Sequence, residues 1–254
     1  MVSSSNGRLV ILSGPSCVGK SPLSKAFWKF HPELSSRLRP LVLYNCRAPR
    51  PGERDGIDYY FRTRAQVESF RTDNRYVVIN VRGDLQALDL EQVQALLTSG
   101  NAFFEGNPFV GMCLLTHPRL ADIPKLSIFL SPLSKDELLY LGAPENNLKL
   151  NELVCDVMRR KLLRRTRRQK GELSGMDLEN IERRAGSAYA ELQEACHFDH
   201  VIPNHDGEDS DNWDAFYYPL GDARNAINAF VALLQGQVPA GVEKWDARLL
   251  PVVT

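Results

Sequence analysis

Eight residues near the N-terminus have the types and the spacing that bind phosphate. They read Gly14-Pro-Ser-Cys-Val-Gly-Lys-Ser21 and directly follow the apolar run 8–13. Glycines let a backbone curl so that successive N–H groups point at phosphate oxygens, and the first turn of a helix adds partial positive charge. A lysine at this spacing reaches the β- and γ-phosphates of ATP, and the following hydroxyl ligates Mg2+. The alternative, an accidental glycine-rich turn, is disfavoured by the strand before the segment and the helix pattern after it.

This phosphate loop predicts ATP and Mg2+ as cofactors, but it contains one unusual residue. Pro22 follows Ser21 at a position where nucleotide-binding loops usually carry a residue with a backbone N–H. Proline suits the first turn of a helix and removes one hydrogen-bond donor, so weaker or altered nucleotide binding is a consequence to test. The residues that we predict to bind ATP here are Gly14, Ser16, Cys17, Val18, Gly19, Lys20, Ser21 and Pro22, with Lys20 also catalytic and Ser21 the metal ligand.

A strongly basic run is the second candidate for chemistry. The helix pattern 147–169 grades into this run, which contains Arg159, Arg160, Lys161, Arg164, Arg165, Arg167, Arg168 and Lys170. Such a run can bind ATP phosphates, can bind nucleic acid, or can simply be a solvated helix face. Aromatic residues that would stack on bases are not interleaved with it, which disfavours nucleic acid.

The elements that must position these residues alternate along the chain. Buried-strand patterns occupy 8–13, 41–44, 76–81, 102–105, 126–130 and 198–202, and helix patterns occupy 22–30, 64–72, 89–99, 147–169, 178–195 and 222–234. This alternation predicts an α/β fold with a doubly wound parallel sheet and helices on both faces. Residues 206–220 are acidic, aromatic and irregular, which is typical of a surface insertion. The tail after Pro239 carries Trp245, Leu249 and Leu250, which we expect to pack onto the domain.

Composition excludes several classes of protein. The chain has 254 residues, 43% of them hydrophobic and 24% charged, and its 31 basic and 31 acidic residues balance. The five cysteines are scattered without zinc spacing, which favours free thiols in a reducing compartment. Residues 1–7 are polar, unlike a signal peptide, and no apolar run approaches the roughly 18 residues of a membrane span. We therefore expect a cytoplasmic protein without a membrane partner.

Two long motifs resemble guanylate kinases. The phosphate loop is similar to that of the family, and Cys46-Arg-Ala-Pro-Arg-Pro-Gly-Glu-Arg-Asp-Gly-Ile-Asp-Tyr-Tyr-Phe61 looks like its Thr-Arg-x-Pro-Arg-x-Gly-Glu-x-x-Gly-x-Asp-Tyr-x-Phe motif. Segments 128–134, 182–192 and 198–204 also fit, so the resemblance covers about residues 8–204. It implies a P-loop kinase fold with small acceptor-binding and lid subdomains.

The resemblance also implies roles for individual residues. Arg47 and Arg50 would clamp the phosphate of the acceptor, and Tyr59 would add its hydroxyl. Arg184 would close over the transferring phosphoryl group with one or two of Arg164, Arg165, Arg167 and Arg168, of which we assign Arg164 and Arg168 as catalytic. Asn204 would lie near the adenine of ATP.

The match fails where the family reads guanine. The expected Ser, Glu and Tyr-Tyr-Gly are missing, and Asn80, Arg82, Asp84 and Gln86 occupy this region instead, either to read a different acceptor or to face solvent. The family's Leu-Asp-x-Asp strand is replaced by Phe104-Glu-Gly-Asn107. We assign Glu105 and Asn107 to acceptor binding, with Glu105 also suited to support Mg2+. Segments 142–155 and 206–216 have no counterpart that we can place.

These observations together predict one guanylate-kinase-like domain with a core at about 8–44, 101–145 and 196–235. The acceptor-binding subdomain would span about 45–100, the lid about 146–180, and a C-terminal tail 236–254. We expect a monomer or homodimer that transfers the γ-phosphoryl group of ATP to a phosphorylated small molecule. The acceptor would be a nucleoside monophosphate, either GMP-like or with a modified or non-guanine base. Alternatives are a sugar-phosphate kinase of ribose bisphosphate kinase type and a catalytically impaired protein-interaction module.

Overall fold

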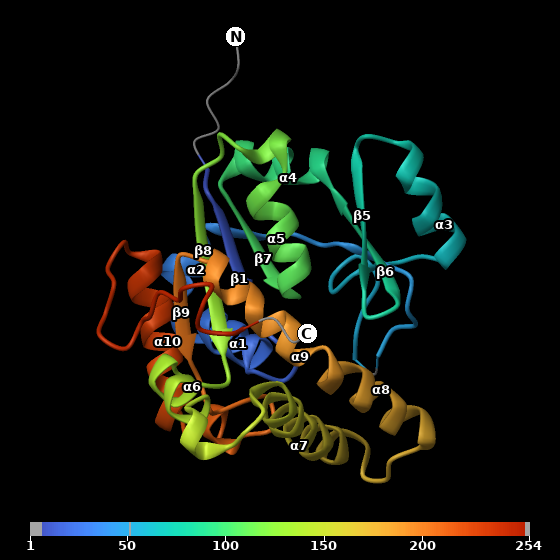
Figure 1. Ribbon diagram of the computed structural model, residues 1–254. Coiled ribbons are helices and arrows are strands. Elements are labelled where there is room, and N and C mark those ends of the chain that lie inside the picture. Colours follow the sequence, from blue (N-terminus) through green and yellow to red (C-terminus); the bar gives the residue numbers. More distant parts are fainter. Residues whose placement is uncertain (1–6, 51, 252–254) are drawn as a thin grey trace.

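A five-stranded parallel sheet forms the centre of the molecule (Figure 1). The computed structural model describes residues 7–50 and 52–251. The strands lie in the order β2-β7-β1-β8-β9. Their bounds are β1 Leu9–Ser13, β2 Leu38–Pro40, β7 Asn101–Gly106, β8 Lys125–Ser131 and β9 His200–Pro203. β1, which precedes the phosphate loop, is the middle strand and pairs with β7 and β8.

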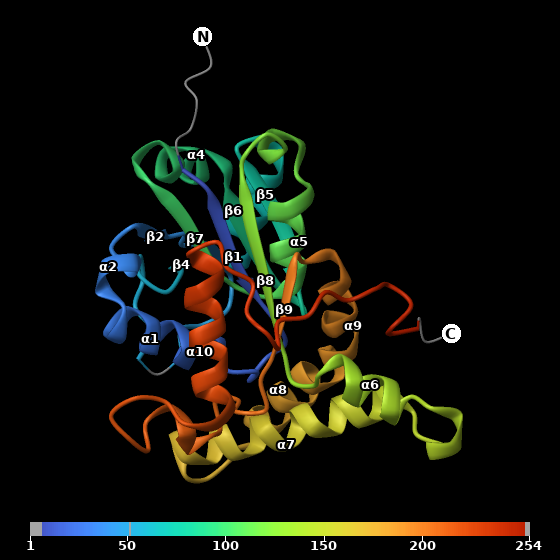
Figure 2. The ribbon, with the colours of Figure 1, turned by 90° about the vertical axis from the view of Figure 1, so that its left-hand side faces the viewer.

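Helices cover both faces of this sheet, as the alternating elements predicted (Figure 2). All five residues of β1 are buried, and successive side chains point to opposite faces. Val10 and Leu12 pack with Phe27 of α1 and Phe230 of α10, whereas Ile11 packs with residues of α4, α5 and α9. These helices are α1 Lys20–Phe30, α4 Leu90–Ser99, α5 Pro108–Thr116, α9 Ala188–Gln193 and α10 Gly221–Leu234.

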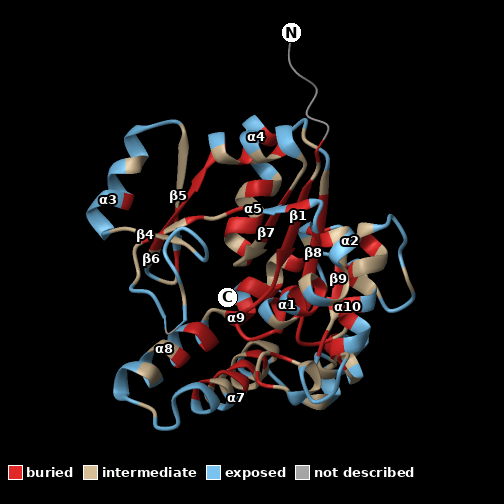
Figure 3. Cartoon of the chain, turned by 180° about the vertical axis from the view of Figure 1, so that it is seen from behind, coloured by how far each residue is buried: buried red, intermediate tan, exposed pale blue. Residues whose placement is uncertain are grey.

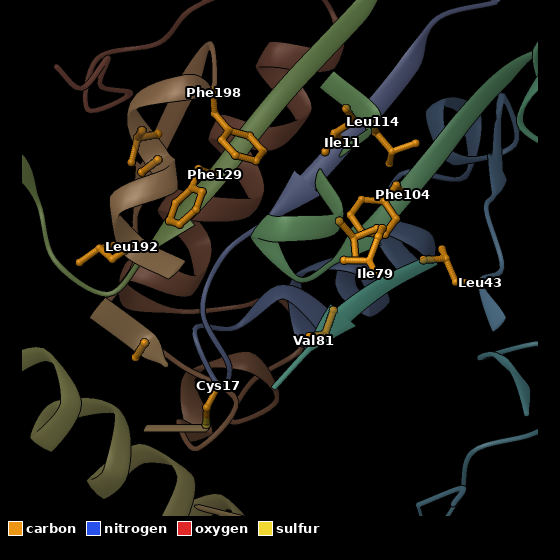
Figure 4. Packing of buried hydrophobic residues seen from close by; sticks show 14 of the residues in the cluster. Ile11, Cys17, Leu43, Ile79, Val81, Phe104, Leu114, Phe129, Leu192 and Phe198 are labelled. Atoms are coloured by element: carbon orange, nitrogen blue, oxygen red, sulfur yellow. The ribbon is translucent and has the colours of Figure 1, made fainter. Parts of the chain in front are cut away.

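A second sheet of four strands lies beside the first, in the order β4-β3-β6-β5. Its strands are β3 Tyr44–Asn45, β4 Tyr60–Phe61, β5 Tyr76–Val81 and β6 Asp84–Asp89, and helix α3 Arg64–Ser69 covers it. β5 and β6 form an antiparallel hairpin whose turn places Arg82 at φ +57°. The two sheets share one hydrophobic core, because Leu43, Ile79 and Val81 pack in the same cluster as Phe104 and Ile11 (Figure 4).

The long helix α7 lies across the end of the central sheet where the phosphate loop lies. It spans Leu150–Lys170 and ends at Gly171, whose φ is +75°. Helix α8 Gly175–Gly186 follows, and α6 Lys135–Leu141 and α2 Pro32–Ser35 complete the α-helices of the described residues. Short 3-10 helices occupy Phe70–Thr72, Pro118–Leu120, Pro144–Asn146, Glu194–His197 and Asp211–Trp213.

Burial follows this architecture, with buried residues concentrated on the central strands and on the inner sides of the helices (Figure 3). The C-terminal tail packs as expected, since Trp245 and Leu250 are buried and Glu243 forms a β-bridge with Val201. Of the polar N-terminal segment 1–7, residues 1–6 lie outside the described residues. No helix of the described chain is both long enough and apolar enough to cross a membrane.

One local prediction was wrong, and several elements were not predicted. Of the strand expected at 41–44, only Tyr44 lies in a strand, because residues 41–43 connect β2 of the central sheet to β3 of the second sheet. Strand β6 was not expected, because five of its six residues are buried and its sequence lacks alternation. Helices α5 and α6 were also missed. Helix α5 is apolar on nearly all sides, and α6 is only seven residues long.

Candidate active site

One cleft collects most of the residues singled out in the sequence. It lies where β1 and β7 end, which is where ligands bind in open parallel sheets. The lining residues are Gly14, Ser16, Lys20, Ser21, Arg47, Arg50, Tyr59, Val81, Arg82, Asp84, Gln86, Glu105, Gly106, Asn107, Arg165, Asn180, Arg183, Arg184 and Glu208. The central sheet, the second sheet and helices α7 and α8 therefore each contribute a wall.

The phosphate loop has backbone geometry that glycine makes possible. Gly19 is at φ +103°, and a Cβ on it would lie 2.6 Å from the Asn204 amide nitrogen, so only glycine fits. In the described chain, no hydrogen bond uses the backbone N–H of Cys17, Val18 or Gly19, which leaves these donors for an anion. The loop therefore has the unfilled donors that a phosphate-binding nest requires.

Lys20 is buried at the bottom of the cleft. Its Nζ donates to the carbonyl oxygens of Gly14 (2.8 Å) and Pro15 (2.7 Å). Burial lowers the pKa of Lys20, and the nearby carboxylates of Glu208 and Glu105 act in the opposite direction. The ammonium group is thus held by two carbonyl oxygens of the loop, and Lys20 lines the cleft.

Cys17 in the loop and Pro22 directly after it do not line the cleft. Cys17 is fully buried at φ +66°, and burial raises the pKa of its thiol to about 12, so the sulfur is protonated and unreactive at neutral pH. Val18 is also fully buried. Pro22 is the third residue of α1, within the first turn, where a backbone N–H has no partner inside the helix.

Two oxygen-bearing side chains lie together beside the loop. The Ser21 Oγ donates to Glu105 Oε1 at 2.8 Å, which joins the start of α1 to the end of β7. Hydroxyl and carboxylate oxygens are the ligands that Mg2+ prefers, and this ion usually binds through one or two protein oxygens plus phosphates and water. These residues therefore fit Mg2+. Asn107 caps α5 by accepting from the Phe109 N–H, and its amide nitrogen is buried without a partner among the described residues.

The two arginines of the second motif lie on the opposite wall. Arg47 makes a two-pronged ion pair with Glu53 (2.6 and 2.7 Å), and Arg50 lies 3.9 Å from the same carboxylate. Burial and the neighbouring Arg47 lower the pKa of Arg50, because its positive charge is incompletely balanced. The Tyr59 ring lies against Arg47, 5.1 Å from ring centroid to guanidinium carbon. Glu53 thus orients a cationic pair toward the cleft.

The arginine of α7 on the cleft wall is Arg165, rather than the predicted Arg164 or Arg168. Arg164 and Arg168 have side chains about half exposed, at 56% and 49%, and pair with Asp209 and Asp211 outside the cleft. Arg165 is 12% exposed and pairs with Glu208 at 2.7 Å. The reason is helical phase, because neighbouring positions on a helix point about 100° apart and sequence alone did not fix which one faced inward.

Arg184 lies deepest of the cleft arginines. Its side chain is buried, and its Nε donates to the Ser16 Oγ at 3.1 Å. Within the part of the chain that the structure describes, no carboxylate lies within 4 Å of it. Burial, with the charges of Arg165, Arg50 and Arg82, places the pKa of Arg184 well below its ordinary value. The site therefore contains a buried cation that lacks an anion.

The segment in which the family reads the acceptor base forms part of the cleft wall. Arg82, Asp84 and Gln86 line the cleft, whereas Asn80 is exposed and accepts from the Gly83 N–H in the hairpin turn. Arg82 is tied to Glu191 of α9 by two contacts of 2.6 Å. Asp84 and Gln86 thus remain as the polar side chains of this wall that can face an acceptor.

Asn204 lies beside the phosphate loop but away from the cleft surface. It is fully buried, and its amide nitrogen donates to Val18 O (2.8 Å) and Asp206 O (2.7 Å). Its observed contacts hold the loop, and the structure places no part of it on the cleft wall. Sequence reasoning missed Glu53, Glu191 and Glu208, the carboxylates that orient the cleft arginines. The Glu in the second motif was a signal for Glu53, but no sequence spacing pairs Glu191 or Glu208 with an arginine more than 40 residues away.

The fold and the phosphate loop together define a P-loop protein whose cleft contains two clusters of cationic side chains. The family model described as guanylate kinase matches residues 6–105. The chain is 31% identical over 215 residues to a guanylate kinase of Synechococcus sp. (strain JA-3-3Ab), covering 84% of this chain and 83% of that one. It is 27% identical over 205 residues to a guanylate kinase of Rickettsia bellii (strain RML369-C), covering 80% and 89%.

A solved structure has the same fold. The crystal structure of guanylate kinase from Anaplasma phagocytophilum superposes with a TM-score of 0.54 at 17% identity, covering 92% of this chain and 87% of that one. On these relationships the chain belongs to the guanylate kinase family. It is a nucleotide kinase, and therefore a phosphotransferase, which confirms the predicted enzyme class and α/β fold.

Proposed function

We propose that this protein transfers the γ-phosphoryl group of ATP to a nucleoside monophosphate, with GMP as the first acceptor to test. The observation that carries the proposal is Arg184, a buried guanidinium that donates to the Ser16 hydroxyl of the phosphate loop and has no carboxylate within 4 Å among the described residues. A buried unpaired charge is costly unless an anion joins it. A phosphate group bound between Arg184, Lys20 and the loop supplies that anion.

Each residue of the cleft takes a role according to the wall on which it lies. The phosphate loop and Lys20 hold the β- and γ-phosphates of ATP, while Arg47, Arg50 and Tyr59 hold the phosphate of the acceptor. Between them, Arg165 and Arg184 neutralise charge that spreads over the oxygens of the transferring group. When bound at Ser21 with support from Glu105, Mg2+ would neutralise further phosphate charge. The core, the acceptor-binding segment 45–100 and the lid 146–180 are the corresponding subdomains.

Asp84 and Gln86 are the proposed contacts for the acceptor base. A carboxylate accepts hydrogen bonds from adjacent N–H donors, which the N1 and 2-amino groups of guanine supply, and a Gln amide can donate to its O6. Adenine lacks this pair of donors. The names of the relatives also favour GMP. Hydroxyl groups of a sugar phosphate are the other partners that such a wall can bind.

The test is a coupled assay of ADP production with GMP, IMP, AMP, pyrimidine monophosphates and ribose phosphates. We expect turnover with GMP, loss of at least about 100-fold in kcat for Lys20→Ala, and loss of base preference for Asp84→Asn. Turnover that survives Lys20→Ala unchanged would refute the mechanism. Turnover with ribose bisphosphate alone would identify a sugar-phosphate kinase, and absence of ATP binding by calorimetry would favour an interaction module.

A further inference from the structure

A turn rich in carboxylates lies between the phosphate loop and helix α7. It comprises residues 206–211, reads Asp-Gly-Glu-Asp-Ser-Asp, and is called the acidic turn below. It belongs to the segment that the family resemblance left without a counterpart. It contributes Glu208 to the wall of the catalytic cleft.

The acidic turn is held in one conformation by its own contacts. The Asp206 carboxylate accepts from Ser210 Oγ (2.7 Å), Asn212 Nδ2 (2.9 and 3.0 Å) and the Ala223 N–H (3.0 Å). The Trp213 indole N–H donates to Asp206 O at 2.9 Å. A turn with this many fixed groups presents its next residues in a defined orientation.

The same turn touches the phosphate loop. The Glu208 N–H donates to Cys17 O at 3.3 Å. A Cβ on Gly207 would lie 2.3 Å from that oxygen, so the two backbones are packed as closely as glycine permits. Direct backbone contact therefore fixes the position of Glu208 relative to the phosphate loop.

Three carboxylates of the turn pair with three arginines of α7. Asp209 pairs with Arg164 (2.7 Å), Glu208 with Arg165 (2.7 Å) and Asp211 with Arg168 (2.8 Å). Only the Glu208–Arg165 pair lines the cleft. Both of its side chains are largely buried, at 17% and 12% exposure, so it is far less screened by solvent than the outer Asp211–Arg168 pair.

Glu208 holds one edge of the Arg165 guanidinium and leaves the rest available. The Arg165 NH1 is bound to Glu208 Oε2, while its Nε is buried and has no partner among the described residues. Burial tends to raise the pKa of Glu208, but Arg165 and Lys20 outweigh it and the pKa lies below its ordinary value. The carboxylate is thus ionised, and it anchors an arginine whose other donors can still bind an anion.

We propose that Glu208 is a positioning residue for phosphoryl transfer, because it fixes Arg165 relative to the phosphate loop before ATP binds. The inference rests on the proposed function. The cleft is lined by seven cationic side chains and three carboxylates, Glu208 among them, so the site keeps the positive charge that a triphosphate needs. Without Glu208, the long Arg165 side chain would have to be ordered by the substrate in every turnover, which costs side-chain entropy.

The test compares steady-state kinetics of Glu208→Gln, Glu208→Asp and the matched outer variant Asp211→Asn. We expect Glu208→Gln to lower kcat about 10- to 100-fold with KM for ATP changed less than about threefold, and Glu208→Asp to recover part of the loss. Asp211→Asn should leave both constants within about twofold, because its arginine does not face the cleft. In an Arg165→Ala background, Glu208→Gln should change kcat less than about twofold, since the two residues act as one unit.

Three results would overturn the proposal. A fall in KM for ATP with kcat preserved in Glu208→Gln would make the carboxylate a competitor of the phosphates. Equal effects of Asp211→Asn and Glu208→Gln would make the turn a general anchor of α7. Additive effects of Glu208→Gln and Arg165→Ala would show that Glu208 does not act through Arg165.

A second measurement is independent of turnover. In protein labelled with 15N-arginine, the N–H protons of the Arg165 NH1 group, which donate to Glu208, should exchange slowly, and this protection should be lost in Glu208→Gln and kept in Asp211→Asn. Absence of kinase activity in the wild-type protein would contradict the proposed function. An Arg165 signal that is insensitive to Glu208→Gln would contradict this inference.

Discussion

Replacing Glu191 by Gln should destabilise the protein strongly, although the side chain does not line the cleft. Glu191 is fully buried, and it contacts Arg82 twice at 2.6 Å and accepts from the Ser187 Oγ at 2.8 Å. Removing one partner of a buried ion pair costs about 3 kcal/mol or more, because the other charge is left without compensation. Arg82 also sits in a left-handed turn at φ +57°, and the pair helps to hold that strained position.

The expected shift is measurable. For a domain of this size, about 1 kcal/mol corresponds to a Tm change of roughly 2–4 °C, so Glu191→Gln should lower Tm by about 6–12 °C. Urea unfolding should show a lower midpoint with an unchanged m-value. Because Arg82 belongs to the β5–β6 hairpin of the acceptor wall, KM for the acceptor should rise while KM for ATP changes little.

Two control variants test whether the loss of stability comes from the buried Arg82–Glu191 pair. Glu152→Gln removes a carboxylate from a pair whose side chains are 66% and 74% exposed, and should change stability by less than about 0.5 kcal/mol. The double variant Arg82→Met with Glu191→Leu removes both charges and should regain most of the loss. If the free energy of unfolding of Glu191→Gln lies within about 1 kcal/mol of the wild-type value, the Arg82–Glu191 pair does not stabilise the fold as predicted.

Three further predictions follow from other contacts. Arg184→Met should lower kcat by about 10³-fold yet raise stability by about 1 kcal/mol, because it removes a buried charge that has no carboxylate partner in the described part of the chain; a lower urea midpoint would contradict this. The His205 ring contacts the carboxylates of Asp222 (2.6 Å) and Glu137 (2.9 Å). Burial lowers the pKa of His205, but these two carboxylates outweigh burial, so the pKa in the folded protein is raised. The protonated ring therefore stabilises the folded protein fully below about pH 6.5, and this stabilisation is lost as pH rises through the folded-state pKa. The difference in Tm between wild type and His205→Gln should therefore shrink toward alkaline pH, and a difference that grows would contradict it. Gly207→Ala should displace the acidic turn and lower kcat, whereas Gly186→Ala, where a Cβ meets no atom within 4 Å, should not; equal kinetics for the two variants would contradict this.

Sequence alone predicted the parts of the fold that depend on local pattern. The phosphate loop, its preceding strand and the alternation of strands and helices are properties of short segments, so they were readable. Strand β6 was not, because its burial comes from contacts with a hairpin partner and with α3 rather than from its own periodicity.

The site was predictable to the same extent. Lys20, Arg47, Arg50 and Arg184 follow from motifs, and the structure brings all four to one cleft. The choice of Arg165 over its neighbours required the rotation of α7, which is set by packing of Met158, Leu162 and Thr166. Glu208 required a contact between segments 43 residues apart, which no local pattern encodes.

The position of Trp213 has an optical consequence. Its indole lies 3.1 Å from where a Cβ on Gly19 would stand, and its N–H is bound to the acidic turn. The chain has three tryptophans, and Trp28 and Trp245 lie elsewhere, against Phe103 and in the buried tail. With those two replaced by Phe, the emission of Trp213 alone becomes an intrinsic reporter of the phosphate loop. Nucleotide binding can then be measured by tryptophan fluorescence, without a label and without a coupling enzyme.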